Sequence, residues 1–498
     1  MPLRSPTGIA LIAATVLASM AGFLDATVVN VAVPAIAADL GTGIVTLQWS
    51  VTGYLLTAAA LLLVAGALAD HYGRRRVLGI GLLVMLAASV VCAVAPSFPV
   101  LIAARVVQGV GAALVVPSSL ALLNGTLRMA DRAPGIGIWA GLASLGGLLI
   151  GPFAGGWLVD HVSWRAVFLL NVPLIGGALL ALVPVPESAA ARGRFALDGV
   201  GALLAVIGLA GLIDALTAGP AMGWTSPRVI AGLIVGTACL LALVPAERRV
   251  RQPMIKLSLF ASRQFSAINV ATVFFYGALA AGAYLLVLRC QLILGYTATE
   301  AGAVMIPSSV MFLLLSPVSG ALVPRVGARR PMAAGMLAVG AAFLLLAFTP
   351  GAGYARAILP GALLWGIGLG LTVSPLTAAV LAAVRDTDLG EASAISDVAA
   401  RFGGALLTAL VPVLIGVRAD QDLAAALADG YRTAMVVLTG LCVVAAVICA
   451  VFVRDGKEAP TRFAAPAPYH GCALPDTCPP DRVRTVTTTT TTAMPEAS

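Results

Sequence analysis

Apolar runs long enough to cross a lipid bilayer recur along this chain as far as about residue 453. An α-helix rises 1.5 Å per residue, so about 20 apolar residues in a row span the hydrocarbon core. Charged residues make up only 10% of the 498 residues, whereas soluble domains carry about 25%. The sequence therefore predicts an all-α integral membrane protein.

Breaks rich in Arg, Pro or Gly divide the apolar sequence into fourteen expected transmembrane helices. The first six and the last six form two sets, and two shorter spans separate these sets. In chain order the spans are roughly 9–33, 45–69, 77–94, 100–123, 135–159, 166–183, 200–218, 229–244, 265–288, 299–323, 331–348, 355–384, 392–417 and 431–453.

The basic residues predict the orientation of these spans. Twenty-two of the thirty Lys and Arg residues fall on the side of the N-terminus and six on the other side, while Arg105 and Arg401 lie within spans. Positive residues concentrate on the cytoplasmic side of membrane proteins. We therefore expect a multi-pass protein of the cell (plasma) membrane with both termini cytoplasmic. The net charge of +8 is spread over short loops, which argues against a nucleic-acid partner.

An internal repeat indicates two parallel halves. The sequence GALADHYGRRR at 66–76 returns as GALVPRVGARR at 320–330, an offset of 254 residues. Eight spans separate the two copies, which suits a six-helix repeat only if a helix pair was inserted between the halves. We expect a substrate site between the halves near the membrane midplane. The predicted parts are a six-helix bundle (1–186), the inserted pair (187–250), a second six-helix bundle (251–453) and a disordered cytoplasmic tail (454–498).

Four further stretches agree with a known family in their order and spacing. They are LDATVVNVAVP at 24–34, RVVQGVGAA at 105–113, GLLIGPFAGG at 147–156 and WRAVFLLNVP at 164–173. With the repeated loop and the fourteen spans, they make the chain resemble the fourteen-helix drug/proton antiporters of the major facilitator superfamily, as far as about residue 453. The resemblance implies a major facilitator fold of two six-helix bundles plus two inserted helices. It also implies multidrug efflux coupled to protons.

Asp25 is a lone carboxylate in the first apolar run. A charge at the bilayer centre costs roughly 2.5–3.5 kcal/mol on insertion scales, so its presence needs a reason. Asp25 lies about 24 Å from the cytoplasmic start of its span, and Arg105 lies about 7–8 Å below the outer edge, which gives the two charges similar depths. A static ion pair or snorkelling is the structural alternative. The resemblance implies a proton-linked acid and its basic partner.

The loop after the second span carries Gly66, Asp70, Gly73 and Arg74. Gly66 permits a close helix approach, Gly73 permits a tight turn, and Asp70 can stabilise a neighbouring helix end. The resemblance implies that this loop acts as a latch between conformations. The alternative is that its arginines only set the orientation of the spans in the membrane. In the second copy Pro324 replaces the aspartate.

Small residues line the fifth span. Gly147, Gly151 and Gly155 repeat every four residues and share one face, where another helix can pack closely. Pro152 removes a backbone donor and can bend the helix. Together with Gly156 these residues resemble an antiporter signature, which favours export over uptake.

Three other charged positions have a structural and a functional interpretation. Asp214 is either a second protonatable acid or a side chain that reaches the outer interface. Glu300 follows Thr297 at the spacing of a capping box, with proton handling as the alternative. Asp397 and Arg401 are four apart, and we interpret them as a structural pair.

The sequence predicts a secondary transporter that exports a small lipophilic or cationic organic substrate in exchange for protons. Asn30, Gln48 and Trp49 are the candidate substrate contacts. We expect a monomer surrounded by membrane lipid, and an inserted pair peripheral to the transport path. A dedicated exporter of one natural product, such as a self-made antibiotic, stays open, as does a different class, a membrane sensor or intramembrane enzyme.

No enzyme chemistry is expected, because no nucleophile motif or histidine cluster is present. We expect no cofactor apart from the proton gradient as the energy source. His470, Cys472 and Cys478 are at most three loosely spaced metal ligands, so we expect no metal site.

Overall fold

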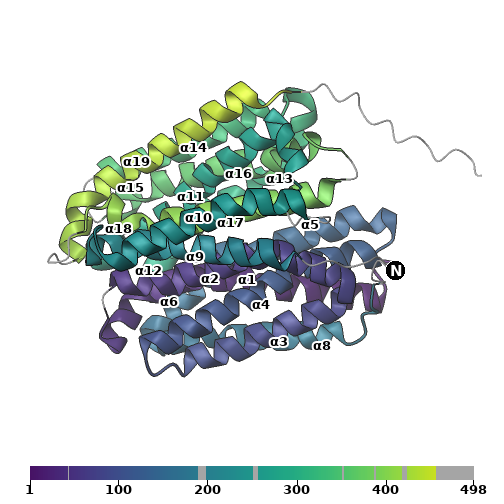
Figure 1. Ribbon diagram of the computed structural model, residues 1–498, viewed down its shortest axis with the longest axis horizontal. Helices are drawn as coiled ribbons and strands as arrows, with labels where there is room; N and C mark the ends of the chain where they lie inside the picture. The colour runs from purple at the N-terminus through teal and green to yellow at the C-terminus, as the bar shows by residue number, and fades with distance from the viewer. Residues whose placement is uncertain are drawn as a thin grey trace, which may run out of the picture. The chain divides into compact units, whose positions relative to one another are not determined.

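The computed structural model of the protein describes residues 1–42, 44–188, 198–250, 256–349, 353–385, 388–417 and 423–455. Within these ranges every regular element is a helix and no strand occurs (Figure 1). Apart from Arg454 and Asp455, the expected tail lies outside the described residues, as do its candidate metal ligands.

The N-terminal half begins with four long helices and continues with shorter ones. Its elements are α1 (Pro6–Leu40), α2 (Ile44–Tyr72), α3 (Arg74–Ala93), α4 (Phe98–Thr126), α5 (Met129–Leu145), the π-helix η1 (Gly146–Ile150), α6 (Gly151–His161), α7 (Trp164–Leu169) and α8 (Asn171–Leu182). The inserted pair is α9 (Gly199–Met222) and α10 (Pro227–Arg249).

The C-terminal half has a similar series. Its elements are the 3₁₀ helix η2 (Leu257–Ala261), α11 (Arg263–Leu292), α12 (Ala298–Ala303), α13 (Ile306–Val326), α14 (Arg329–Phe348), α15 (Tyr354–Ala357), α16 (Leu359–Ala382), α17 (Leu389–Ala409), α18 (Val411–Leu414) and α19 (Leu423–Phe452).

Eleven of the described helical segments are long and apolar enough to cross a membrane, or twelve if α2, bent by 52°, counts as one span. The all-helical membrane architecture is confirmed, but the exact number of fourteen is not. The expected span 135–159 is divided by η1 into α5 and α6. The expected span 392–417 is divided into α17 and the short α18, and Asp397 and Arg401 lower the mean hydropathy of α17.

The two halves share a packing pattern, as the repeat predicts. In the N-terminal half α4 packs against α3 and α2, and in the C-terminal half α16 packs against α14 and α13. Glycines allow close approach at both places. A methyl group on Gly111 would meet Met85 of α3 at 2.8 Å, and one on Gly368 would meet the carbonyl oxygen of Gly335 on α14 at 2.6 Å.

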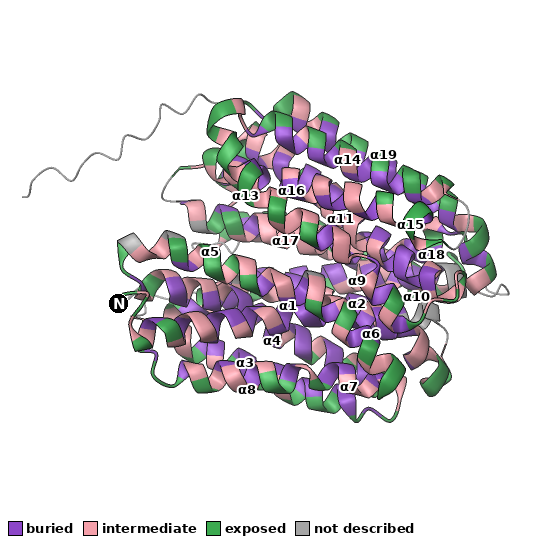
Figure 2. Ribbon diagram, turned by 180° about the vertical axis from the view of Figure 1, so that it is seen from behind, coloured by how far each residue is buried: buried purple, intermediate pink, exposed green. Residues whose placement is uncertain are grey.

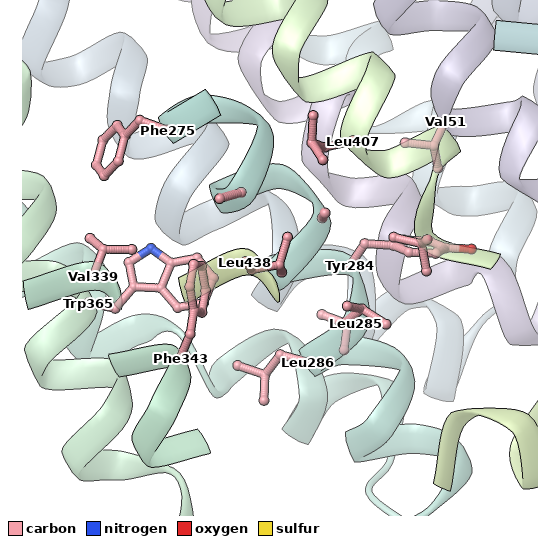
Figure 3. Packing of buried hydrophobic residues seen from close by; sticks show 14 of the residues in the cluster. Val51, Phe275, Tyr284, Leu285, Leu286, Val339, Phe343, Trp365, Leu407 and Leu438 are labelled. Atoms are coloured by element: carbon pink, nitrogen blue, oxygen red, sulfur yellow. The ribbon is translucent and has the colours of Figure 1, made fainter. Parts of the chain in front are cut away.

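Buried residues lie on the inward faces of the helices in each half (Figure 2), and most of them are apolar. In the C-terminal half the rings of Phe343 and Trp365 meet edge to face, with centroids 4.8 Å apart, and both are fully or nearly fully buried (Figure 3). The described membrane helices expose large apolar side chains on their other faces, for example Ile80 and Leu83 on α3. Such faces suit contact with lipid.

The halves meet at one end, the end at which α1 finishes and α2 begins, which we call the far end. Here α6 packs against α12 and α2 packs against α17. The Asp160 carboxylate accepts hydrogen bonds from the backbone N–H groups of Ala298 and Thr299, at 3.1 and 2.7 Å. Gln291 donates to the Val31 carbonyl at 3.0 Å. Polar contacts therefore hold the far end closed.

The inserted pair contacts both halves of the molecule. α9 and α10 pack against each other, and α9 also packs against α2 of the N-terminal half and α17 of the C-terminal half. Leu209 and Ile213 of α9 share an apolar cluster with Leu56 of α2 and Ala405 of α17. The helix α9 thus contacts both halves, and these contacts bury its apolar side chains.

Candidate functional site

Asp25 and Arg105 form an ion pair inside the N-terminal half. Arg105 Nη1 lies 2.5 Å from Asp25 Oδ2, and both side chains are 0% exposed. Arg105 Nε donates to the Ser50 carbonyl at 2.7 Å, and Nη1 also donates to Gln108 Oε1 at 2.7 Å. The equal depth predicted from the sequence therefore corresponds to a direct contact between α1 and α4.

Two amides satisfy the other oxygen of the Asp25 carboxylate. Gln108 Nε2 and Asn171 Nδ2 each donate to Asp25 Oδ1 at 2.9 Å. Both amides also donate to Ser89 Oγ, at 2.8 and 3.2 Å. Helices α1, α3, α4 and α8 thus each supply one part of a buried polar network. Both carboxylate oxygens thus have hydrogen-bond partners, as buried polar groups require.

Aromatic rings enclose the guanidinium group. Its central carbon lies 4.5 Å from the centroid of Tyr54 and 5.9 Å from that of Phe168. The Tyr54 hydroxyl donates to the Gly22 carbonyl at 2.8 Å, which fixes the ring. Cation–π contacts contribute more where water is excluded.

The sequence interpretation identified the two charges but missed Ser89, Gln108, Asn171 and Tyr54. Gln108 and Asn171 stand within the stretches RVVQGVGAA and WRAVFLLNVP. Their polarity inside apolar spans was a usable signal, because a buried amide needs partners. Ser89 and Tyr54 carry no such signal, because both types are common in membrane helices.

The ion pair makes the arrangement of this site sensitive to the charge on Asp25. Protonation of Asp25 removes the negative charge and leaves the Arg105 guanidinium without its counter-ion in a site that excludes water. An uncompensated buried charge is strongly destabilising, by about 3–5 kcal/mol. The protonated site therefore favours an arrangement that rehydrates Arg105 or offers it another partner.

The loop after α2 is tightly bonded. Arg74 Nη2 lies 2.8 Å from Asp70 Oδ1, and Arg74 Nη1 donates to the Ala121 carbonyl at 3.0 Å. Gly73 has a φ of 102° and begins α3. At Gly66 the described residues make no close helix approach, since apart from its own helix backbone and chain neighbours none of their atoms lies within 4 Å of the place a methyl group would take.

An acid from beyond α8 caps α3. Glu187 accepts hydrogen bonds from the backbone N–H groups of Arg75 and Arg76, at 2.9 and 3.2 Å. The second copy repeats this arrangement, because Asp455 accepts from the N–H of Arg329 at 3.0 Å, beside Gly327 with its φ of 80°. Both halves thus hold the first turn of the helix after the repeated loop with a carboxylate distant in sequence.

The glycine face of the fifth span packs on α1, as predicted. A methyl group on Gly147 would lie 2.9 Å from Phe23 Cβ, and one on Gly151 would lie 3.0 Å from Thr27 Oγ1. Gly155 lies against Val28. Thr27 Oγ1 also donates to the Gly147 carbonyl at 2.7 Å. No side chain larger than glycine fits these places without displacing α1.

Pro152 and Gly156 of the same stretch face the other half. Gly156 lies against the Ala298 carbonyl of α12, and the Pro152 carbonyl lies against Gly302. Pro152 stands in the first turn of α6, directly after η1. Within α6, Gly151 and Gly155 therefore face α1, while Pro152 and Gly156 face the other half.

The two candidate second acids have partners outside the buried network. Asp214 accepts from Arg228 at 2.7 and 3.1 Å near the turn between α9 and α10. The predicted capping box is present, because the Thr297 N–H donates to Glu300 Oε2 at 2.9 Å and the Glu300 N–H donates to Thr297 Oγ1 at 3.2 Å. These contacts give both acids structural roles.

The three candidate substrate contacts differ from one another. Asn30 Oδ1 is buried and has no hydrogen-bond partner among the described residues. Gln48 is buried and donates to the Thr408 carbonyl of α17, so it joins the halves instead of facing an open cavity. Trp49 packs on the cluster of α2, α9 and α17. Asn30 therefore presents a buried polar atom without a partner among the described residues.

The chain matches the Major Facilitator Superfamily over residues 15–409. It belongs to this superfamily. The protein is therefore a transporter and not an enzyme. In the part of the chain that the structure describes, no group of three or more His, Cys, Asp or Glu side chains suits a metal ion.

Similar proteins include named drug-resistance and export proteins. The multidrug resistance protein Stp of Mycobacterium tuberculosis (strain CDC 1551 / Oshkosh) is 38% identical over 77% of this chain and 71% of its own length. The probable actinorhodin transporter of Streptomyces coelicolor is 34% identical over 84% of this chain and 74% of its own length.

The fold is also that of a solved transporter. A crystal structure of the POT family transporter PepTSo has a TM-score of 0.66 and covers 90% of this chain and 98% of its own, at 14% identity. At this identity the likeness shows the fold alone.

Proposed function

We propose that this protein exports lipophilic organic compounds across the cell membrane in exchange for protons. Similarity to proteins named for multidrug resistance and for antibiotic resistance and export supports the substrate class. The fully buried Asp25–Arg105 pair is the observation that supports proton coupling. The proton gradient serves as the energy source, and the protein acts as a monomer surrounded by lipid.

The proposed cycle follows from the closed far end. With both termini cytoplasmic, the closed far end is the outer one, and Asp25 is shielded from the outside in this state. Opening of the outer end lets Asp25 take up a proton and favours release of substrate. Closure of the outer end and opening of the inner end then deliver the proton to the cytoplasm. Each elementary charge moved across the membrane contributes about 2.3 kcal/mol per 100 mV.

Transport in proteoliposomes tests this proposal. An imposed pH gradient should drive a lipophilic dye in the opposite direction to protons, and Asp25→Asn should abolish gradient-driven transport because it removes the titratable group and keeps the shape. Asp39→Asn is the matched control, since Asp39 stands near the end of the same helix and is half-exposed beside Arg165. Gradient-driven transport by Asp25→Asn at the wild-type rate would place the proton site elsewhere.

A narrower substrate range is the second candidate function. Several similar proteins are named for a single compound, among them the tetracenomycin C resistance and export protein of Streptomyces glaucescens and the puromycin resistance protein pur8 of Streptomyces alboniger. A transport screen over chemically diverse compounds separates the two candidates. A multidrug exporter moves several unrelated scaffolds, whereas a dedicated exporter moves one.

A further inference from the structure

The Arg105 guanidinium has partners on α2 that carry no charge of their own. Its Nε donates to the Ser50 carbonyl at 2.7 Å, and its central carbon lies 4.5 Å from the centroid of the Tyr54 ring. Ser50 and Tyr54 are four residues apart, so they share one side of the helix, which faces α4. Both contacts remain available when Asp25 takes up a proton, whereas the ion pair is lost.

Tyr54 is fixed in this position by two neighbouring helices. The residue is 1% exposed, and its hydroxyl donates to the Gly22 carbonyl of α1 at 2.8 Å. Its backbone packs on α4, because a methyl group on Gly109 would lie 2.6 Å from the Tyr54 carbonyl oxygen. The ring therefore cannot turn away from the guanidinium unless the hydrogen bond to α1 breaks.

The titratable groups around the ring include one whose charge changes. Asp25 of α1 and Arg105 of α4 both act electrostatically on Tyr54, and Cys92 of α3 donates to Gln108 within the same network, at 3.7 Å. Near neutral pH a free phenol and a free thiol are neutral and a guanidinium is positive. Within the buried network the Asp25 carboxylate is thus the group expected to gain and lose a proton.

A charged pair of the C-terminal half also faces Tyr54. Arg401 of α17 acts electrostatically on the Tyr54 hydroxyl, and its Nε lies 3.3 Å from Asp397 Oδ2. The Asp397 side chain is 47% exposed, and water weakens the field of an exposed charge. The signal of Asp25 must therefore be separated from that of Asp397 by substitution of Asp25 itself.

The ring attracts a lone cation more strongly than it attracts an ion pair. The face of an aromatic ring is negative, so it attracts the guanidinium and repels a carboxylate beside it. When Asp25 is neutral, the repulsive part disappears and the contact between Tyr54 and Arg105 becomes stronger. The site excludes water, which increases the contribution of such a contact.

We propose that Tyr54 is a positioning residue of the proton site, and that its ring holds the Arg105 guanidinium in place while Asp25 is protonated. Protonation forms one O–H bond on the Asp25 carboxylate and leaves Arg105 charged. The guanidinium then keeps the Ser50 carbonyl and the Tyr54 ring as partners, so the buried cation is not left without compensation. The proposal rests on the proposed proton-coupled export and adds the group that makes the protonated state accessible.

Infrared spectra of the purified full-length protein, recorded over a range of pH, test the proposal. A carboxyl C=O stretching band that Asp25→Asn abolishes reports protonation of Asp25. Tyr54→Leu should lower the midpoint pH of this band by about one unit, a tenfold higher proton concentration, because the protonated state loses the ring. Tyr54→Phe keeps the ring and should keep the midpoint of the wild type, although it loses the hydrogen bond to Gly22.

Tyr284→Leu is the matched control. Tyr284 of α11 is also almost fully buried, at 2% exposure, but it lies in an apolar cluster (Figure 3). Its replacement should lower the apparent melting temperature without moving the midpoint of the Asp25 band. Equal shifts in Tyr284→Leu and Tyr54→Leu would overturn the proposal, because loss of packing would then explain both.

Fluorinated phenylalanines at position 54 keep the test valid if Tyr54→Leu does not fold. One, two or three ring fluorines preserve the shape of the ring and withdraw charge from its face step by step. The midpoint pH should fall with each added fluorine. An unchanged midpoint through the series would overturn the proposal, and so would a midpoint in Tyr54→Phe that differs from the wild type as much as that of Tyr54→Leu.

The proposed function fails independently of this inference. Wild-type proteoliposomes that move no compound under a pH gradient, together with a midpoint that falls through the fluorinated series, would refute proton-coupled export and retain the role of Tyr54. Gradient-driven export that Asp25→Asn abolishes, together with an unchanged midpoint through the series, would retain export and refute the role of Tyr54.

Discussion

At the scale of single residues, partners decide what each charge does. Asp25, Asp214 and Asp397 all lie in helices that the sequence assigns to the membrane, yet their surroundings differ. The Asp25 carboxylate accepts three hydrogen bonds from three side chains and has no exposure. Asp214 pairs with Arg228 near a turn, and Asp397 is half-exposed beside Arg401. The same residue type thus serves as a buried charge, a structural pair and an accessible acid.

Gly73 offers a residue-scale prediction about the loop after α2. Its φ of 102° is unfavourable for residues with a side chain, and a methyl group there would lie 2.7 Å from the Glu187 carboxyl carbon. We expect Gly73→Ala to destabilise the protein by about 1–3 kcal/mol, seen as a lower apparent melting temperature in detergent.

Gly66→Ala is the control for this prediction. Gly66 lies in the same repeated motif but has open space around it, and alanine favours a helix more than glycine does. Gly66→Ala should therefore leave the melting temperature unchanged or raise it slightly. Equal losses in the two variants would contradict the assigned role of the Gly73 backbone.

At the scale of elements, close packing and a change of helix type shape the fifth span. α5, η1 and α6 form one path along α1, and the glycine face touches α1 at Phe23, Thr27 and Val28. The π-helix inserts an extra residue into one turn, which rotates α6 relative to α5. Within α6 itself, Pro152 and Gly156 reach α12, while Gly151 and Gly155 stay on α1.

Gly151→Leu is the element-scale prediction. The larger side chain would collide with Thr27 and Leu24, and overpacking of this kind costs about 1–3 kcal/mol. We expect transport to fall strongly in a whole-cell dye-efflux assay.

Gly141→Leu on α5 is the matched control for this variant, because nothing lies within 4 Å of that glycine. It should export normally. Normal export by Gly151→Leu would show that close packing against α1 is not needed for transport.

The sequence predicted the elements better than it predicted the site. Apolar periodicity and breaks placed almost every long helix, since burial in lipid demands long apolar runs. The equal depth of Asp25 and Arg105 followed from helix rise alone. Partners such as Glu187, 112 residues from Arg75, depend on how distant segments pack, and no local pattern encodes that. The division of the fifth span at η1 was missed for a similar reason, because a π-helix has no sequence signal as clear as proline.

At the scale of the whole molecule, a conformational change that opens the far end must break the contacts between the two halves there. Asp160 meets the first turn of α12 through two backbone N–H groups and the Thr299 hydroxyl. A carboxylate at a helix N-terminus stabilises it by about 0.3–1 kcal/mol, and by up to about 2 kcal/mol in favourable geometries. A small change at this place can therefore shift the balance between the two conformations.

Asp160→Asn should open the far end more often. A loss of about 1 kcal/mol changes the population ratio about fivefold. Spin labels at Val162 and Ile293, on opposite halves, should report a larger fraction of long distances by pulsed electron paramagnetic resonance.

Asp131→Asn is the control, because Asp131 bonds within the N-terminal half at the opposite end, to the N–H of Leu3 at 3.1 Å. It should leave the distance distribution unchanged. An unchanged distribution for Asp160→Asn would show that other contacts set the balance.

The position of α9 has a consequence for compounds dissolved in the bilayer. A two-bundle transporter has two lateral boundaries between its bundles, and in this protein α9 lies along one of them, against α2 and α17. Molecules diffusing in the plane of the membrane meet protein there, not a direct passage between the bundles. The inserted pair therefore makes the two lateral boundaries of the transporter different from each other. Two symmetric halves alone would present equivalent boundaries to the lipid.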